Sequence, residues 1–182
     1  MFSSDSQESV TPRLRKDVTK IGEKLLYILT RECYVHRGEK LVKWDFFGPF
    51  FISLFLPLVV YFPGSQRDSN AENLAFSLFF TFIWCMAFLC SLNACLIGTY
   101  MDYMPFMSIV LYELLPICVA SVIGKILPFS LKAVVVISAV CYSLMLSKRT
   151  LEGHLIKGKW ILVYKPIMFM YSVIGGLVLF NT

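Results

Sequence analysis

Ionisable residues lie inside strongly apolar stretches of this chain, and two of them could support chemistry. Glu113 falls within the apolar run 106–126, and Lys165 lies near the start of the run 160–180. Ionisable groups in such surroundings are rare and mark substrate pathways, proton relays or buried pairs. Counted from the start of each run, the two residues lie about 10 and 8 Å along their helices at about 1.5 Å per residue. We therefore expect Glu113 and Lys165 to form an intramembrane charge pair, the alternative being that Lys165 extends to the membrane surface.

Other arrangements that could support catalysis are missing from the sequence. The two histidines, His36 and His154, both flank apolar runs, and neither a Gly-x-Ser-x-Gly elbow nor a His-Glu-x-x-His helix occurs. No pair of carboxylates lies within the runs, which disfavours a metal site. The complete phosphate-binding loop, Gly-x-x-x-x-Gly-Lys-Ser/Thr, is also missing. We predict that the chain is not an enzyme and uses no metal or cofactor; a small membrane transporter using Glu113 and Lys165 is the alternative.

Five apolar runs must position these residues. A bilayer core of about 30 Å needs about 20 helical residues to cross it, and the runs cover residues 46–62, 74–97, 106–126, 128–146 and 160–180. The chain is 57% hydrophobic and only 16% charged, whereas soluble domains are about 25% charged. We expect an all-α integral membrane protein built as a five-span transmembrane helix bundle.

Small residues recur every four positions within these runs. Such stripes let helix backbones approach closely in lipid, and they comprise Ala87, Ser91 and Cys95; Ala120 and Gly124; Ala139, Ser143 and Ser147; and Ser172 and Gly176. They predict close helix packing, either within the bundle or against another membrane protein. The cysteines of the runs are expected to pack in the same way, without a disulfide or metal set.

The first 43 residues have a different character. Residues 1–12 are Ser-rich and acidic, which predicts a disordered cytosolic tail. Within the juxtamembrane segment 13–43, apolar residues recur at helical spacing, namely Val18, Ile21, Leu25, Ile28 and Leu29. This pattern predicts an amphipathic helix at the cytosolic membrane interface, lying either on the lipid or against the bundle. Cys33 is a candidate for reversible acylation, or else a free thiol.

Basic residues predict the orientation. Thirteen of them precede the first run or separate the fourth from the fifth, whereas three lie on the opposite side. Cytosolic loops carry the excess of Lys and Arg, so we expect a cytosolic N-terminus and a lumenal or extracellular C-terminus. The basic residues that give the chain its net charge of +5 lie beside the membrane. This distribution argues against a nucleic-acid partner.

Three short motifs resemble those of a known family. They are the junction Trp44-Asp45-Phe46-Phe47-Gly48-Pro49, the end of the second run with Asn93 and Gly98, and Tyr112-Glu113-Leu114-Leu115-Pro116 in the third run. Together with the segment Asp17-Val18-Thr19-Lys20-Ile21-Gly22-Glu23-Lys24, they make roughly residues 15–180 similar to the Yip domain (YIPF) family of Golgi and ER membrane proteins, and most similar to the branch of the sixth numbered YIPF paralogue. The resemblance implies that residues 44–182 are a Yip-type five-span membrane domain. Glu113 departs from the family pattern, which has a small neutral residue there.

This resemblance implies a function in membrane trafficking. Family members are five-span proteins of the Golgi or ER membrane that associate with Rab-type small GTPases and with other Yip proteins in vesicle transport. On this basis Asp45, Gly48 and Pro49 are expected to hold the N-terminal segment against the bundle, with Tyr112 and Pro116 packing within it. The alternative is that these residues only fix the fold.

Overall fold

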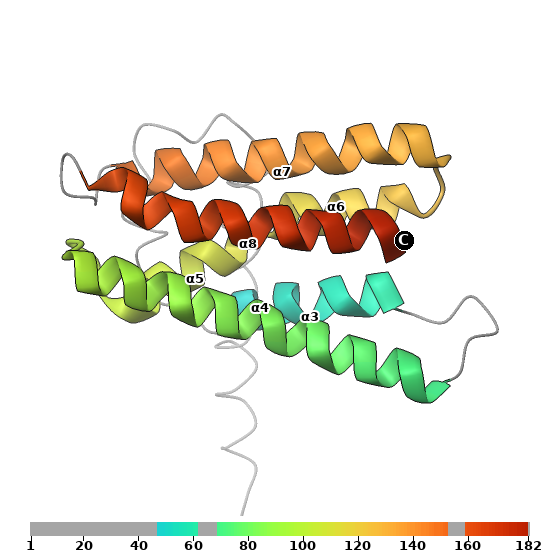
Figure 1. Cartoon of the computed structure of the whole chain (residues 1–182), viewed down its shortest axis with the longest axis horizontal. Coiled ribbons are helices and arrows are strands. Elements are labelled where there is room, and N and C mark those ends of the chain that lie inside the picture. The colour runs from blue at the N-terminus through green and yellow to red at the C-terminus, as the bar shows by residue number, and fades with distance from the viewer. Residues whose placement is uncertain (1–46, 62–68, 153–158, 182) are drawn as a thin grey trace, which may run out of the picture.

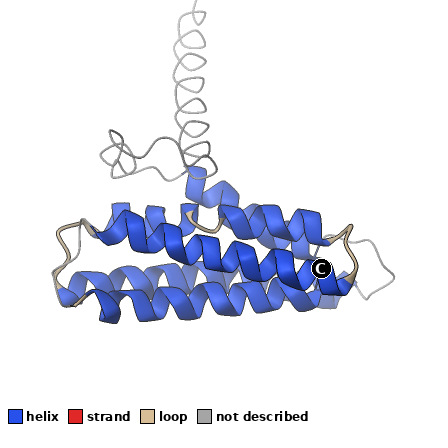
Figure 2. Cartoon of the chain, turned by 90° about the horizontal axis from the view of Figure 1, so that it is seen from above, coloured by secondary structure: helices blue, strands red, loops and turns tan. Residues whose placement is uncertain are grey.

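The computed structural model describes residues 47–61, 69–152 and 159–181, and every regular element in these ranges is an α-helix. In chain order the helices are α3 (Phe47–Tyr61), α4 (Ser69–Ile97), α5 (Tyr103–Tyr112), α6 (Leu115–Gly124), α7 (Phe129–Glu152) and α8 (Trp160–Asn181). They lie side by side along one direction and form an elongated bundle (Figures 1 and 2). The expected tail 1–12, the segment 13–43, Trp44, Asp45 and His154 fall outside the described residues.

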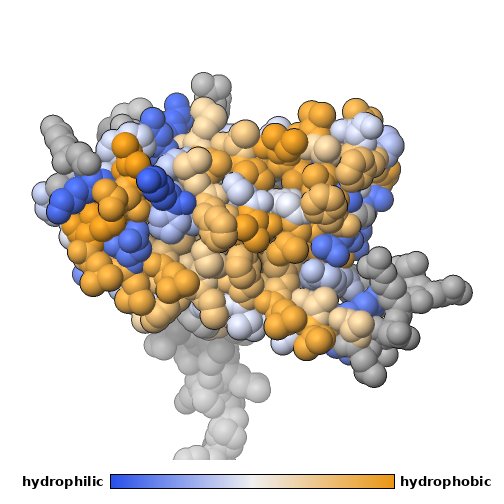
Figure 3. Space-filling view, in the orientation of Figure 1, coloured by the Kyte–Doolittle hydropathy of each residue, from blue (hydrophilic) through white to orange (hydrophobic). Residues whose placement is uncertain are grey.

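Four stretches of helix are long and apolar enough to cross a bilayer, namely 71–97, 103–124, 129–151 and 160–181. They confirm four of the expected spans. The helix for the first run, α3, has 15 residues and is therefore about 22 Å long at about 1.5 Å per residue, shorter than the hydrocarbon core. Apolar side chains cover the middle of the face in Figure 3, with hydrophilic ones gathered toward its two ends. The chain is an all-α integral membrane protein.

The third span is not one continuous helix, as the run 106–126 suggested, but two helices that meet at Glu113 and Leu114. The Glu113 amide still donates to Ile109 O at 3.0 Å, whereas the Leu114 amide donates to Leu111 O at 3.3 Å, a tighter three-residue turn. Pro116 explains the change. It has no N–H to donate to the carbonyl of Tyr112, and its ring would collide with that carbonyl in a continuous α-helix.

The broken span lies at the centre of the bundle. The apolar window of 103–124 is 67% buried, compared with 28%, 28% and 39% for the windows of α4, α7 and α8. Several of its side chains, including Phe106, Ile109, Leu114 and Ile117, are almost completely enclosed. Because the other helices cover most of α5 and α6 and leave Glu113 only 1% exposed, the break places Glu113 inside protein and not against lipid.

Side-chain hydrogen bonds between described residues join neighbouring helices, and three of them follow. Trp84 Nε1 on α4 donates to Ser53 Oγ on α3 at 3.1 Å. Asn93 Nδ2 on α4 donates to the carbonyl of Leu162 on α8 at 3.0 Å, and Tyr164 Oη on α8 donates to Leu144 O on α7 at 2.6 Å. Such bonds contribute about 0.6 kcal/mol each in helical membrane proteins, so they orient the helices more than they hold them together.

The small-residue stripes are used in part. Ala87, Ser91, Ser143 and Ser147 are buried, while Cys95 and Ser172 are exposed. On α8 the close approach occurs one residue before the expected stripe. A Cβ added at Gly175 would overlap the side chain of Val140 on α7, whereas one added at Gly176 would meet no atom within 4 Å.

Candidate functional site

A buried polar cluster joins the break in the third span to two other helices. It consists of Glu113 between α5 and α6, Ser147 on α7 and Tyr171 on α8. The Ser147 hydroxyl donates to Glu113 Oε2, and the Tyr171 hydroxyl lies 3.1 Å from the same oxygen. Tyr171 also donates to the carbonyl of Val110 on α5 at 2.9 Å. One carboxyl oxygen of Glu113 therefore contacts hydroxyl groups from two neighbouring helices, α7 and α8.

Glu113 and Tyr171 lie near the middle of their membrane-spanning segments, whereas Ser147 lies five residues before the end of α7. Glu113 is ten residues after Tyr103 and eleven before Gly124, and Tyr171 is eleven residues after Trp160 and ten before Asn181. Glu113 is 1% exposed and Tyr171 is 0% exposed. A charged side chain at this depth costs about 3 kcal/mol on insertion scales, so hydroxyl partners at this position have a clear stabilising role.

Two buried oxygen atoms of this region have no hydrogen-bond partner among the described residues. They are Glu113 Oε1 and Ser143 Oγ. Ser143 lies one turn before Ser147 on α7 and is also fully buried. Leaving a polar group unpaired in the interior is costly, and an ionisable residue such as Glu113 within a membrane span is by default a candidate for a functional site.

The expected charge pair between Glu113 and Lys165 is not formed within the described residues. The partners of the buried Glu113 are hydroxyl groups, whereas Lys165 is exposed on α8. The two side chains do not lie at the same depth, because α5 begins at Tyr103, three residues before the apolar run. Glu113 is therefore about 15 Å from the start of its span and Lys165 about 8 Å from the start of α8, at about 1.5 Å per residue. Lys165 is close enough to the end of α8 to reach the interface.

The structure brings two of the family-motif segments together. Gly48, at the start of α3, packs against the ring of Tyr112, and a Cβ at position 48 would overlap the Tyr112 hydroxyl. Tyr112 is 1% exposed, and Pro49 and Pro116 are also buried. Because Tyr112 ends α5, Gly48 lies beside the middle of the third span. The described part of the junction, Gly48 and Pro49, therefore lies within the bundle.

Asn93 and Gly98 have separate structural functions at the end of α4. Asn93 bonds the backbone of α8, as described above. Gly98 has φ of 91°, a conformation that side chains with a Cβ rarely adopt. The amides of Gly98 and Thr99 both donate to Ala94 O, at 3.2 and 3.3 Å. These bonds satisfy the last turn of α4 and direct the chain into α5.

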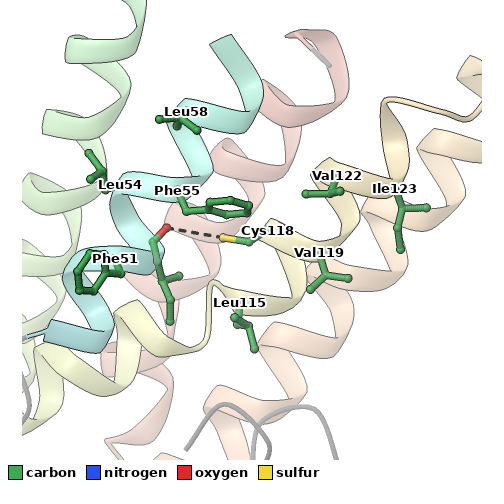
Figure 4. A pocket seen from close by; sticks show the side chains of 10 residues that line it. Phe51, Leu54, Phe55, Leu58, Leu115, Cys118, Val119, Val122 and Ile123 are labelled. Atoms are coloured by element: carbon green, nitrogen blue, oxygen red, sulfur yellow. Dashed lines mark hydrogen bonds between the residues drawn. The ribbon is translucent and has the colours of Figure 1, made fainter. Parts of the chain in front are cut away.

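A hollow lies between α3 and α6. It has a volume of about 500 Å³ and a wholly apolar lining that includes Phe51, Phe55, Leu115 and Val122 (Figure 4). Its only polar feature in Figure 4 is a weak contact of Cys118 Sγ to the carbonyl of Ile52 at 3.8 Å. Such a lining offers hydrocarbon contact and no group that could bind a polar ligand or perform chemistry.

Glu113 was predicted from the sequence as a site residue, but its hydrogen-bond partners Ser147 and Tyr171 were not. Ser143 and Ser147 were assigned only to helix packing, although their spacing of four residues placed both on one face. The signal for Tyr171 was its position in the middle of an apolar run, because a tyrosine there must find a partner for its hydroxyl. Within the described ranges no group of three or more His, Cys, Asp or Glu side chains could hold a metal ion.

The helices and the buried cluster define a multi-pass α-helical membrane protein with a polar centre at a broken span. The chain is similar over nearly its whole length to proteins of the Yip family named YIP4 and YIPF6. It is 24% identical to Protein YIP4 of Schizosaccharomyces pombe, covering 94% of this chain and 73% of that protein. It is 25% identical to Protein YIPF6 of Homo sapiens, covering 97% and 77%. Protein YIP4b of Arabidopsis thaliana is 26% identical over 94% of this chain and 61% of its own length.

No protein-family model matches the chain, and no solved structure matches it.

Proposed function

We propose that this protein is a trafficking factor of Golgi or ER membranes that binds Rab-type small GTPases and other Yip proteins in vesicle transport. The observation that carries the proposal is similarity to Yip relatives over more than nine tenths of the chain. The contact between Gly48 and Tyr112 supports it, because it joins two of the motifs on which the family resemblance rests.

A prenylated GTPase sits on the cytosolic leaflet, so its docking surface must lie at the cytosolic end of the bundle. We assign that end to the turn between α4 and α5, with the exposed Asp102, and to the ends of α7 and α8 that face each other across residues 153–158. Lys148 Nζ on α7 lies 5.4 Å from the ring centre of Trp160 on α8. Basic and aromatic side chains of this kind are typical of the cytosolic interface.

The experiment is recovery of GTPases with the full-length protein. The wild type, solubilised from native membranes in GDP or in a non-hydrolysable GTP analogue, should co-purify Rab-type GTPases in a nucleotide-dependent manner. Gly48→Leu, which would push the Tyr112 ring aside, should reduce recovery, while Phe55→Leu on the exposed face of α3 should not. Equal recovery in both nucleotides and from all variants would contradict the proposal.

A transporter is the second candidate, because a buried carboxyl group at a broken helix is the arrangement that transporters use for substrates and coupling ions. Only Glu113 of the two expected residues still supports it. A substrate-dependent or ion-dependent flux in proteoliposomes, lost in Glu113→Gln, would favour this candidate over a trafficking factor.

A further inference from the structure

The hydroxyl contacts around Glu113 require more protons than the hydroxyl groups supply. Besides the longer contact of Ser147 Oγ with Tyr171 Oη at 3.4 Å, three contacts meet there: Tyr171 Oη with Val110 O at 2.9 Å, Tyr171 Oη with Glu113 Oε2 at 3.1 Å, and Ser147 Oγ with the same Oε2. A hydroxyl group has one proton to donate, and a backbone carbonyl or an ionised carboxylate has none. Two donated protons therefore have to serve three contacts.

A proton on the carboxyl group completes the set. Tyr171 then donates to Val110 O, which is its shorter contact, and Glu113 Oε2 donates its own proton to Tyr171 Oη. Ser147 donates to Oε2. Each of the three contacts now holds one proton, and the unpartnered Oε1 becomes the carbonyl oxygen of a neutral acid. Leaving a neutral oxygen unpaired in the interior costs far less than leaving a charged one unpaired.

We propose that Glu113, Tyr171 and Ser147 form a buried proton-binding site, in which Glu113 carries a proton on Oε2 that is directed at the Tyr171 hydroxyl. The site joins the break between α5 and α6 to α7 and α8, so loss of the proton would leave a charge among three packed elements. The proposal does not depend on the trafficking partner.

The surroundings of Glu113 supply no compensating positive charge among the described residues. Ser147 and Thr150 face it from α7 and Tyr171 and Tyr164 from α8, while Cys90 of α4 lies beside Tyr171. On α3, the described residues include no acidic or basic side chain. Lys165 is exposed. A proton is therefore the cation that this site can hold without any further ligand.

The direct test is infrared spectroscopy of the purified full-length protein in lipid nanodiscs at neutral pH. A protonated carboxyl group has a C=O stretching band apart from the amide bands, and the band shifts in D2O. Wild type and Asp102→Asn, which removes an exposed carboxylate, should both have this band, and Glu113→Gln should lose it. Its absence from the wild type, or its persistence in Glu113→Gln, would overturn the proposal.

Tyr171→Phe tests where the proton points. Removing the acceptor hydroxyl should keep the band but move it to higher frequency, because the acid has lost a hydrogen bond. An unshifted band would refute the assignment to Oε2 and Tyr171. The spectra of Tyr171→Phe and of the wild type together test whether Glu113 is protonated, even if Glu113→Gln does not fold.

Thermal unfolding against pH gives an independent measurement. The folded state holds a proton that the unfolded state releases, so the Tm of the wild type should fall as the pH rises from about 4.3, the ordinary pKa of a glutamate side chain, through neutrality. Glu113→Gln should lack this fall, while Asp102→Asn should retain it. Parallel pH profiles for the wild type and Glu113→Gln would contradict a linked proton.

Discussion

Gly48 of α3 packs directly against the phenol ring of Tyr112 at the end of α5, with no space for even a methyl group between them. The two residues are 64 positions apart in the chain. Their contact places the start of α3 beside the break in the third span, since Tyr112 directly precedes Glu113 in the chain. It thereby connects the junction motif to the broken span.

Gly48→Ala should destabilise the protein by about 1–3 kcal/mol, the usual cost of overpacking a filled core. The added Cβ would overlap the Tyr112 hydroxyl, so the ring must move. Gly176→Ala is the matched control, because a Cβ there meets no atom within 4 Å. The measurement is thermal unfolding in detergent. Equal Tm values for the two variants would mean that the Tyr112 ring gives way without cost.

Gly98→Ala should cost about 1–2 kcal/mol, because an L-residue with a Cβ is strained in the left-handed conformation that Gly98 adopts. Gly98→Asn should lose less, since asparagine tolerates this conformation better than alanine. Urea or heat unfolding of the two variants would compare them. A Gly98→Asn protein less stable than Gly98→Ala would point to a steric reason for the glycine instead.

Glu113 and Lys165 should behave as independent residues. In a double-mutant cycle, Glu113→Gln and Lys165→Met are expected to be additive within about 0.5 kcal/mol, as for sites without shared partners. Glu113→Gln and Tyr171→Phe share a hydrogen bond and should show a coupling energy of about 0.5–3 kcal/mol. A coupling energy between Glu113 and Lys165 as large as that between Glu113 and Tyr171 would show that Glu113 and Lys165 do form an ion pair.

The N-terminus should be cytosolic and the C-terminus lumenal. Lys148, Arg149 and Lys159 flank the connection between α7 and α8, whereas Lys125 and Lys132 flank the opposite connection between α6 and α7. Protease treatment of sealed vesicles should digest a tag at the N-terminus and spare one at the C-terminus. Digestion of both tags would mean an even number of crossings, and α3, whose 15 residues make it shorter than the four membrane-spanning stretches, would then be the segment that does not span.

The sequence alone determined the class of protein, the bounds of four spans to within a few residues and the two positions with ionisable side chains. Hydrophobic length decides membrane insertion almost by itself, because every backbone polar group in lipid must be paired within a helix. Motif residues were sufficient for the Yip resemblance. The predictions for 1–12, 13–43, Trp44, Asp45 and Cys33 concern residues outside the described ranges, and they stay predictions.

Only the tertiary structure decided the partners of those residues. The angle between α5 and α6 depends on how Pro116 interrupts the backbone, and the neighbours of Glu113 depend on how α7 and α8 rotate about their axes. A rotation of one residue moves a side chain by about 100° around a helix with 3.6 residues per turn. Spacing along the chain cannot fix that rotation, because it is set by packing such as that of Gly175 against Val140. Hydroxyl groups from α7 and α8 therefore meet Glu113, while Lys165, which the sequence had paired with it, faces outward.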